Sequence, residues 1–543
     1  MPASVLGDLS LFFLISVAVV AYHYVERRNR AVSKLQCAPL DQAHWLWGHE
    51  YAIWSSEANV KHSQHSRWAT ILGPLYRIKA PLFGNDVVVT SDNTAAQHIL
   101  QHCYRYVKAP EFRPTAERWL GKGVIWAEGD EHKHQRRLLA PAFTLAAVRG
   151  MMDDVIACVE RVSYRYFYSM KNRNTDFGAS QTATGLSEHL ASQGGDAVVN
   201  LSPFISSCTL DIIGRIAFGH DFGGGISEDA QNIAESWHHD VLLAHTFAGF
   251  FAPILLVKFP WIQKLPVAAL QTDGVAKQVA HRIGSQILKD NAAESSGKDI
   301  LSILLDNQKH NRKESERLSD ETLLANISTF LMVGHETTSC SIIFSLYELA
   351  GQPDIQEKLR REIHALGSDL NYDSISNLSF LDAVIREGLR LHAPSPRTDR
   401  VALEDDVIPF SRPIVAANGH AITSLPIKAG QIIQIPTSVL NTDPEVWGPD
   451  AHVFKPSRWL ETAMPIDQLP RGPVSGLASF LDGPRNCLGW RLAVLEFKVI
   501  LALLIRDFSF ERTGAKVEEF RAATTQAFVG NEVMMPLRVC LAQ

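Results

Sequence analysis

The sequence predicts a mainly α-helical fold with small β-sheets, in one large domain behind an N-terminal membrane segment. Apolar residues recur with helical periodicity over residues 130–168, 200–218, 277–290, 320–350 and 353–366. The segments that favour strands are short: a hairpin over 75–90, and strands and turns after residue 397. No Gly/Pro-rich linker divides the interior, so we expect one domain in spite of the length of 543 residues.

The composition excludes several classes of protein. The chain has 52 basic and 58 acidic residues and a formal net charge of -6, which gives no support for nucleic-acid binding. Its 7 cysteines are an odd number and have no paired spacing, so no disulfide framework is expected. Scattered cysteines of this kind are typical of a reducing compartment.

The N-terminal segment is predicted to be an uncleaved membrane anchor. Residues 9–25 carry no charge and are mostly apolar, at the short end of what crosses a bilayer. Arginines follow this segment and none precedes it, so the positive-inside rule places the rest of the chain in the cytoplasm. A cleaved signal peptide is the alternative, but its basic residues would come first. We therefore expect an anchor over 1–30, a linker over 31–50 and the main domain over 51–543.

Two further segments are distinctive. Residues 171–196 are rich in Ser, Thr, Gly and Asn and are predicted to form a surface loop. Residues 241–262 are apolar but are interrupted by Pro253 and Pro260. We expect a buried or membrane-dipping helix pair there, with a second transmembrane helix as the alternative.

A short motif near the C-terminus carries the strongest chemical signal. The segment FLDGPRNCLG, from Phe480 to Gly489, matches F-x-x-G-x-R-x-C-x-G at every fixed position. It resembles the haem-binding motif of the cytochrome P-450 superfamily, and the pattern is most similar to membrane-bound microsomal fungal members. Gly483 suits a tight loop, and a helix that begins beside Cys487 would favour its thiolate. The resemblance implies haem b with Cys487 as the iron ligand, Arg485 on a propionate and Phe480 near the sulfur.

A second motif, MVGHETT, lies in a long apolar helix. It resembles the A/G-G-x-D/E-T-T motif of the same family, on the helix above the haem. The resemblance implies room for dioxygen at Gly334, hydrogen bonding by Thr337 and a proton relay through Glu336. Val333 stands where the family usually has Ala or Gly, so we expect either a wall beside the iron or a helix contact. His335 occupies a variable position, and a role as second iron ligand is not favoured.

A third motif, E-x-x-R, has a structural meaning. Glu387 and Arg390 are spaced to meet on one helix face. In the family this pair joins a later arginine, here Arg458, in a buried network behind the haem. Such a network is tolerated only when every member is paired.

Further haem contacts are expected from weaker patterns. His132 and Arg136 lie four residues apart and resemble the family's G-x-x-W-x-x-x-R segment, with His132 in place of Trp. The resemblance implies that both contact one propionate and that Arg400 contacts the other. A solvated surface charge is the alternative for Arg400.

The resemblance covers nearly the whole chain and implies a haem-thiolate monooxygenase on the endoplasmic reticulum membrane, single-pass, with its catalytic domain in the cytosol. No G-x-G-x-x-G lies in a strand–turn–helix context, so the electrons must come from a partner. The implied partner is an NADPH-cytochrome reductase, with cytochrome b5 as a further candidate. Residues that could give its docking face positive charge are Lys133, Arg137 and Arg491.

The substrate is expected to be lipophilic, with a terpenoid, a steroid or another secondary metabolite as the default. Its pocket walls are expected near Val124, Ile125, Phe330, Pro394 and residues 525–528. One alternative is a haem-thiolate isomerase or dehydratase that needs no reductase, and another is a non-catalytic haem-binding protein. The intact Glu-Thr pair in the second motif favours the monooxygenase over both.

Overall fold

The computed structural model describes residues 31–55, 63–164, 196–259, 261–262, 274–293, 299–302, 305, 317–367, 370–461, 470–521 and 524–542. The anchor expected over 1–30 and nearly all of the loop expected over 171–196 lie outside them. The chain divides into two compact units, which are described separately. Of the described residues, the smaller unit combines 31–55, 64–109 and 398–436, and the larger unit holds the rest.

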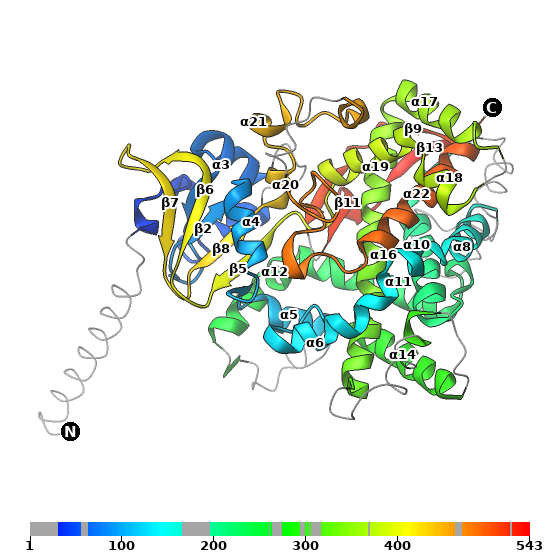
Figure 1. Ribbon diagram of the computed structural model, residues 1–543, viewed down its shortest axis with the longest axis horizontal. Helices are drawn as coiled ribbons and strands as arrows, with labels where there is room; N and C mark the ends of the chain where they lie inside the picture. Colours follow the sequence, from blue (N-terminus) through cyan, green and yellow to red (C-terminus); the bar gives the residue numbers. More distant parts are fainter. Residues whose placement is uncertain are drawn as a thin grey trace, which may run out of the picture. The chain divides into compact units, whose positions relative to one another are not determined.

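The smaller unit is built on a five-stranded sheet in the order β1-β2-β8-β5-β3, with the β6–β7 hairpin as a separate pair. The elements are η1 (Val32–Lys34), η2 (Leu40–Gln42), α2 (Glu50–Ser55), α3 (Gln64–Leu72), β1 (Leu75–Ile78), β2 (Val87–Thr90), α4 (Asn93–Gln101), β3 (Tyr106–Lys108), β5 (Thr398–Ala402), β6 (Asp406–Val415), β7 (Ala421–Ile427) and β8 (Ile432–Ile435). In Figure 1 its strands are blue where they come from the N-terminal part and yellow where they come from residues 398–436. The hairpin expected over 75–90 is confirmed, because β1 and β2 pair antiparallel.

Residues 31–50 differ from the linker that was expected. Val32, Leu35 and Ala38 are buried in the smaller unit. The backbone N–H of Ala38 donates to the carbonyl of Arg77 on β1 at 2.9 Å, and the N–H of Arg77 donates to Gln36 at 2.8 Å. These apolar side chains and backbone groups extend the sheet, so the segment is part of the folded unit.

The larger unit contains most of the helices. They are α5 (Phe112–Trp119), α6 (Gly129–Leu139), η4 (Ala140–Phe143), α7 (Leu145–Arg149), α8 (Met152–Tyr164), α10 (Leu201–Phe218), η5 (Gly223–Gly225), α11 (Glu228–His245), α12 (Phe247–Lys258), α14 (Val275–Ala293), α16 (Asp320–Ala350), α17 (Pro353–His364), α18 (Tyr372–Ser376), α19 (Ser379–Leu391), α20 (Thr437–Leu440), α21 (Pro444–Trp447), η8 (Pro456–Trp459), η10 (Gly483–Arg485) and α22 (Trp490–Asp507). Two three-stranded sheets accompany them, in the orders β10-β11-β12 and β4-β13-β9. Their strands are β4 (Asp196–Asn200), β9 (Phe508–Arg512), β10 (Glu518–Arg521), β11 (Thr525–Val529), β12 (Glu532–Val533) and β13 (Pro536–Leu541).

Helix α16 organises the core of this unit. It begins where the Ser319 side chain accepts a hydrogen bond from Thr322 N–H, a typical N-cap. It runs through the middle of the larger unit, and α10 and α22 pack against it (Figure 1). The helix is apolar on nearly every face, which is typical of a buried core helix.

Two predicted helical segments are interrupted. The helix expected over 130–168 is divided into α6, α7 and α8 near Pro141 and Gly150. The helix pair expected over 241–262 exists as α11 and α12, which are bent by 79°. The bend lies at Thr246, whose side chain accepts from Gly249 N–H and starts α12, while Pro253 is accommodated inside α12.

One helix in the described part of the chain, α10, is long and apolar enough to cross a membrane. Its apolar window is 72% buried against other elements, which is typical of a core helix in a folded domain. Helices α11 and α12 reach the same length and apolarity only when counted together across their bend.

Candidate active site

The loop that holds Cys487 joins η10 to α22. Gly483 has a φ of 71°, in the left-handed region that glycine adopts without strain. The backbone N–H of Cys487 donates to the carbonyl of Phe480 at 2.9 Å and closes the loop. Helix α22 begins at Trp490, so its N-terminus lies beside the cysteine as expected.

The sulfur of Cys487 is accessible although protein surrounds it. Among the cysteines, Cys487 alone has an exposed side chain, and four of the others are buried. Burial raises the pKa of its thiol, whereas the N–H of Gly489 and the charge of Arg136 lower it. These two groups would favour a thiolate over a thiol, and a thiolate is the form that binds a metal.

Two arginines lie at this loop. Arg136, on α6, donates from Nη1 to the carbonyl of Asn486 at 2.7 Å and from Nη2 to the amide oxygen of the same residue. Arg485 is buried and donates to the carbonyl of Ala127 at 2.9 Å and to the Glu128 carboxylate. Guanidinium groups beside an accessible thiol suit a ligand that carries both iron and carboxylates.

The remaining predicted contacts are placed differently. His132 is buried one turn before Arg136 on α6. Arg400 belongs to the smaller unit, on β5, where it is buried and not a solvated surface charge. Its Nη1 donates to the hydroxyl of Thr398 at 2.7 Å and to the carbonyl of Asp399 at 3.0 Å. Arg136, Arg485 and Cys487 therefore belong to one site in the larger unit, and Arg400 belongs to the smaller unit.

A partly exposed stripe interrupts the buried surface of α16. Between residues 325 and 346 every residue is buried except Phe330, Val333, Gly334 and Thr337, which are partly exposed. These positions follow the i, i+3, i+4, i+7 spacing and therefore share one face. An accessible face in the middle of a core helix is typical of the wall of an internal site. We call these four residues the α16 stripe.

Phe143 connects the α16 stripe with the cysteine loop. Its ring packs edge-on against Phe330, with centroids 5.7 Å apart. A Cβ at Gly489 would lie 3.7 Å from the same ring. Phe143 therefore contacts both the stripe and the cysteine loop. Sequence reasoning missed Phe143, because no motif marks it.

The glycine and the glutamate of the second motif, MVGHETT, also contact neighbouring elements. A Cβ at Gly334 would lie 2.9 Å from Cγ1 of Ile213 on α10, so this glycine allows the two helices to pack closely. Packing is thus one reason for a glycine at this position, and the room for dioxygen expected there stays a prediction. Glu336 is buried on the side of α10 and β11, where it accepts from Ser206 Oγ at 3.4 Å and from Gln526 Nε2 at 2.9 Å.

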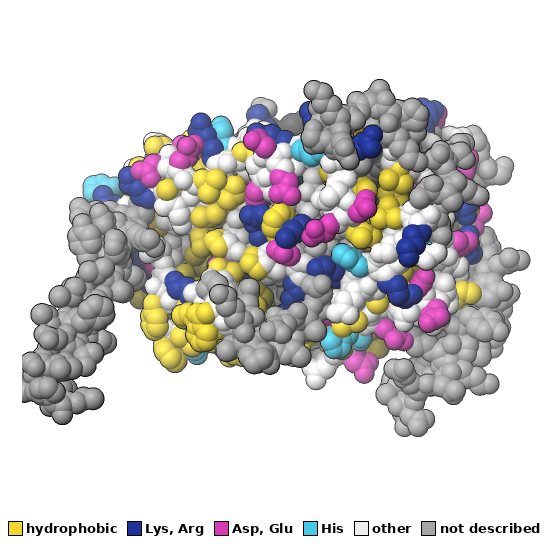
Figure 2. Space-filling view, turned by 90° about the horizontal axis from the view of Figure 1, so that it is seen from below, with side chains coloured by type: hydrophobic (Ala, Val, Ile, Leu, Met, Phe, Trp, Pro, Cys, Tyr) yellow, Lys and Arg dark blue, Asp and Glu magenta, His cyan; other side chains and the backbone are white. Residues whose placement is uncertain are grey.

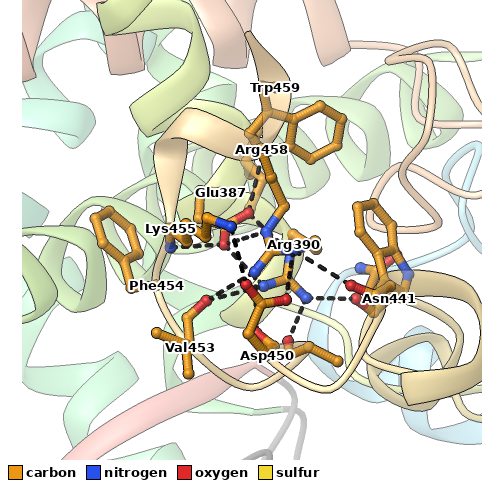
Figure 3. A network of polar contacts seen from close by, with 12 residues as sticks. Glu387, Arg390, Asn441, Asp450, Val453, Phe454, Lys455, Arg458 and Trp459 are labelled. Atoms are coloured by element: carbon orange, nitrogen blue, oxygen red, sulfur yellow. Dashed lines mark hydrogen bonds and ion pairs between the residues drawn. The ribbon is translucent and has the colours of Figure 1, made fainter. Parts of the chain in front are cut away.

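The expected Glu387 network is confirmed in full (Figure 3). Both oxygens of Glu387 accept from Arg390 at 2.8 Å, and neither side chain is exposed. Arg458 adds a bond at 2.9 Å, and the Lys455 N–H and the Trp459 indole N–H add two more. Arg390 also donates to the carbonyl of Asn441, whose side chain bonds Ala478 and Ser479, so the network supports the segment before the cysteine loop.

A second buried charge cluster was not predicted. His392 lies between Glu519, 2.6 Å from Nδ1, and Glu348, 3.2 Å from Nε2. Burial opposes the charge of His392, but its bonds to both carboxylates raise its pKa to about 9. The three residues come from distant parts of the sequence, so no local signal could have found them.

The pH dependence of stability follows from His392. Unfolded histidine has a pKa of about 6.5, so the imidazolium stabilises the fold fully below that pH and less as the pH rises through about 9. We expect His392→Gln to lower the free energy of unfolding by about 3 kcal/mol at pH 6 and by much less at pH 10. Denaturant titration at both values checks this, with exposed His364→Gln as the control. An equal loss at both values would contradict a charged His392.

Comparison with known proteins gives consistent matches. Residues 39–529 match the family model described as Cytochrome P450. A protein of Postia placenta named cytochrome P450 monooxygenase 205 is 31% identical, over 86% of this chain and 84% of its own length. Cytochrome P450 monooxygenase claU of Ampulloclitocybe clavipes is 32% identical over 90% of this chain and 88% of its own. Ganoderic acid synthetase CYP5150L8 of Ganoderma lucidum is 30% identical over 86% of this chain and 90% of its own.

Proposed function

The chain belongs to the cytochrome P450 family, and from this we propose that it is a membrane-anchored monooxygenase that inserts one oxygen atom of O2 into a lipophilic small molecule. Enzymes of this family are oxygen-incorporating oxidoreductases, and their cofactor is haem with an axial cysteine thiolate. The observation that carries the proposal is the accessible sulfur of Cys487, beside two arginines and near the α16 stripe.

The residues of the larger unit would hold the cofactor as follows. Bound through Cys487, haem supplies the iron chemistry that activates dioxygen. With haem bound, Arg485 and Arg136 would exchange bonds to Glu128 and Asn486 for bonds to propionates, since guanidinium binds carboxylates well. Phe480, whose carbonyl accepts from the Cys487 N–H, is proposed to pack near the sulfur. His132 supports Arg136 from the same helix face, and in the smaller unit Arg400 is the candidate for the second propionate.

Thr337 is the residue of the motif that faces the site. Its hydroxyl donates to the Val333 carbonyl at 2.8 Å, and its oxygen keeps a lone pair and a position on the accessible face. From there it can hold water at the place where dioxygen is reduced. Glu336, the preceding residue, lies on the buried side and would supply the proton, so the two residues act from different faces of one helix turn. This pairing favours oxygen activation over the isomerase or dehydratase alternative.

The substrate is proposed to be a hydrophobic secondary metabolite. The walls contributed by Phe330 and Val333 are apolar, and neither can pair with a charged group. One relative is named ganoderic acid synthetase, and others are fungal monooxygenases, which supports a terpenoid-like or steroid-like substrate. Val333 gives this pocket a rigid β-branched side chain, which would limit how a substrate carbon approaches the iron.

Electrons are proposed to come from NADPH through a reductase on the endoplasmic reticulum membrane, with cytochrome b5 as a further donor. Lys133 and Arg137 on α6 are exposed and available for docking, and Arg491 is partly exposed on α22. The described side chains on the face in Figure 2 mix positive, negative and apolar groups, so charge alone does not mark one docking area there. In the smaller unit, Trp45 and Phe83 are exposed and could rest on the lipid surface next to the anchor.

Reconstitution tests this function. The full chain in lipid, with NADPH and a fungal P450 reductase, would be screened against terpenoids and steroids under ¹⁸O2. We expect a product that contains one ¹⁸O atom and whose formation requires NADPH. A product formed without NADPH or O2 would support the isomerase instead, and haem binding without any turnover would support a non-catalytic protein.

Thr337→Ala is expected to bind haem and to consume NADPH, but to release more of the electrons as peroxide, because water at the site loses its hydrogen-bond partner. We expect several-fold less product per NADPH, because a correctly positioned proton donor is needed for productive oxygen reduction. Thr338→Ala is the matched control, because Thr338 is buried on another face of the helix. Equal coupling in Thr337→Ala and its parent would remove Thr337 from the mechanism.

A further inference from the structure

A buried acid–base pair lies on α16 directly before Thr337. His335 is 1% exposed, and its Nδ1 lies 2.5 Å from the carbonyl oxygen of Leu331, one turn earlier. Its other ring nitrogen, Nε2, lies 3.5 Å from Oε1 of Glu336. The ring is therefore held at both nitrogens, on the side of the helix opposite the α16 stripe.

This geometry determines how many protons the pair holds. A carbonyl oxygen can only accept, so Nδ1 of His335 carries a hydrogen and donates to Leu331. In a neutral imidazole Nε2 would then be an acceptor, and it would face a carboxylate oxygen, which is also an acceptor. Two acceptors that meet in a buried site repel each other, so one further proton belongs between them. The pair holds it either as imidazolium and carboxylate or as imidazole and carboxylic acid.

The surroundings of Glu336 place this proton on the histidine. Gln526 donates to Oε2 at 2.9 Å and Ser206 donates to Oε1, and both bonds favour the charged carboxylate. The indole of Trp237 also acts to lower the pKa of Glu336. Burial acts to raise the pKa of Glu336, but His335, Gln526 and Trp237 together hold it below its usual value.

Other titratable groups near Glu336 cannot replace His335. Cys340, on the same helix, is buried, and the pKa of its thiol is raised far above the usual range by burial and by Glu336. His238, on α11, has its pKa lowered by burial, so it is mostly uncharged at neutral pH. Among the described residues that face Glu336 from α10, α11, α16 and β11, His335 is thus the one that can hold the additional proton.

We propose that His335 and Glu336 together store one proton for the turn of α16 that carries Thr337. In this store His335 is the positioning residue that keeps Glu336 ionised. The proposal rests on the function assigned above to Glu336. When a proton is drawn toward Thr337, it leaves Nε2 of His335 for Oε1 of Glu336. The imidazole becomes neutral, the carboxyl group passes the proton on, and solvent restores it to the pair. No other bond is made or broken.

Infrared spectroscopy of the haem-bound full chain tests the store without substrate or reductase. At pH 7 we expect His335→Gln to gain the C=O band of a buried carboxylic acid, because Glu336 loses its cation and takes up a proton. That band should be absent from the His335→Gln, Glu336→Gln double variant. His364→Gln, at an exposed histidine, should match the parent. Glu496, whose pKa burial raises to about 8, contributes a neutral-acid band to every spectrum and cancels in the differences.

Two infrared results would overturn the proposal. If His335→Gln gains no acid band, the ionisation of Glu336 does not depend on His335. If the single variant Glu336→Gln lacks an acid band that the parent shows, the proton resides on Glu336. The assignment of the proton to His335 is then wrong. Both results are independent of turnover, so they are distinct from a failure of the monooxygenase function itself.

Coupling measurements add the kinetic consequence. In His335→Gln the proton-dependent step should slow by about 10²-fold, the low end of the contribution of a positioned proton donor, and peroxide should replace product. His364→Gln should couple like the parent. Unchanged coupling in His335→Gln would show that the store does not supply the reaction.

Discussion

Cys487→Ala is expected to abolish the thiolate-type spectrum of the reduced carbon monoxide complex completely. A cysteine ligand gives this spectrum because the thiolate donates electron density to the iron. The sulfur of Cys487 is accessible and lies at the N-terminus of α22, next to the Gly489 N–H and Arg136, which both favour its thiolate. No second cysteine lies in such a loop. The measurement is the absorption spectrum of the reduced protein with carbon monoxide.

Two further variants separate ligand loss from misfolding. Cys487→His keeps a ligand at the same place, so it should bind haem and give a nitrogen-type spectrum. Cys37→Ala removes a half-buried thiol in the smaller unit and should leave the parent spectrum unchanged. A thiolate-type spectrum in Cys487→Ala would place the ligand elsewhere and overturn the assignment of the site.

Local patterns predicted much of the fold and of the cysteine loop. Ser319 starts α16 where the periodic segment begins, and the Cys487 loop has its turn at Gly483, because capping and turn chemistry depend on a few adjacent residues. The Glu387 network was also predictable, since a pair three residues apart on a helix must face one way. These features depend little on the rest of the chain.

The direction of Glu336 could not be predicted in the same way. Helix α16 is apolar all round, so periodicity does not say which face meets which neighbour. The residues that decide it, Ile213 beside Gly334 and Gln526 beside Glu336, lie far away in the sequence. The segment 31–50 was expected to be a linker for a related reason. It bonds to β1, which is not adjacent to it in the sequence, so no local pattern shows that it is folded.

The largest loss of stability is expected from Glu387→Gln. The two carboxylate oxygens accept five hydrogen bonds, from Arg390 twice, from Arg458, and from the N–H groups of Lys455 and Trp459. An amide has one acceptor fewer and turns an NH2 group toward the guanidinium groups. It also leaves the fully buried Arg390 without its counter-charge, whereas the nearly buried Arg458 keeps the Asp450 carboxylate at 3.2 Å.

Breaking a buried ion pair from one side costs about 3–5 kcal/mol, because the remaining charge is neither solvated nor paired. We therefore expect Glu387→Gln to lower the free energy of unfolding by about this amount, and to reduce haem retention because the network supports the segment before the cysteine loop. Glu404→Gln makes the same chemical change in an exposed pair with Arg105 and should cost less than about 1 kcal/mol. Denaturant titrations of the two variants and the parent provide the comparison. Equal midpoints for Glu387→Gln and Glu404→Gln would show that the buried network contributes no more than a surface pair.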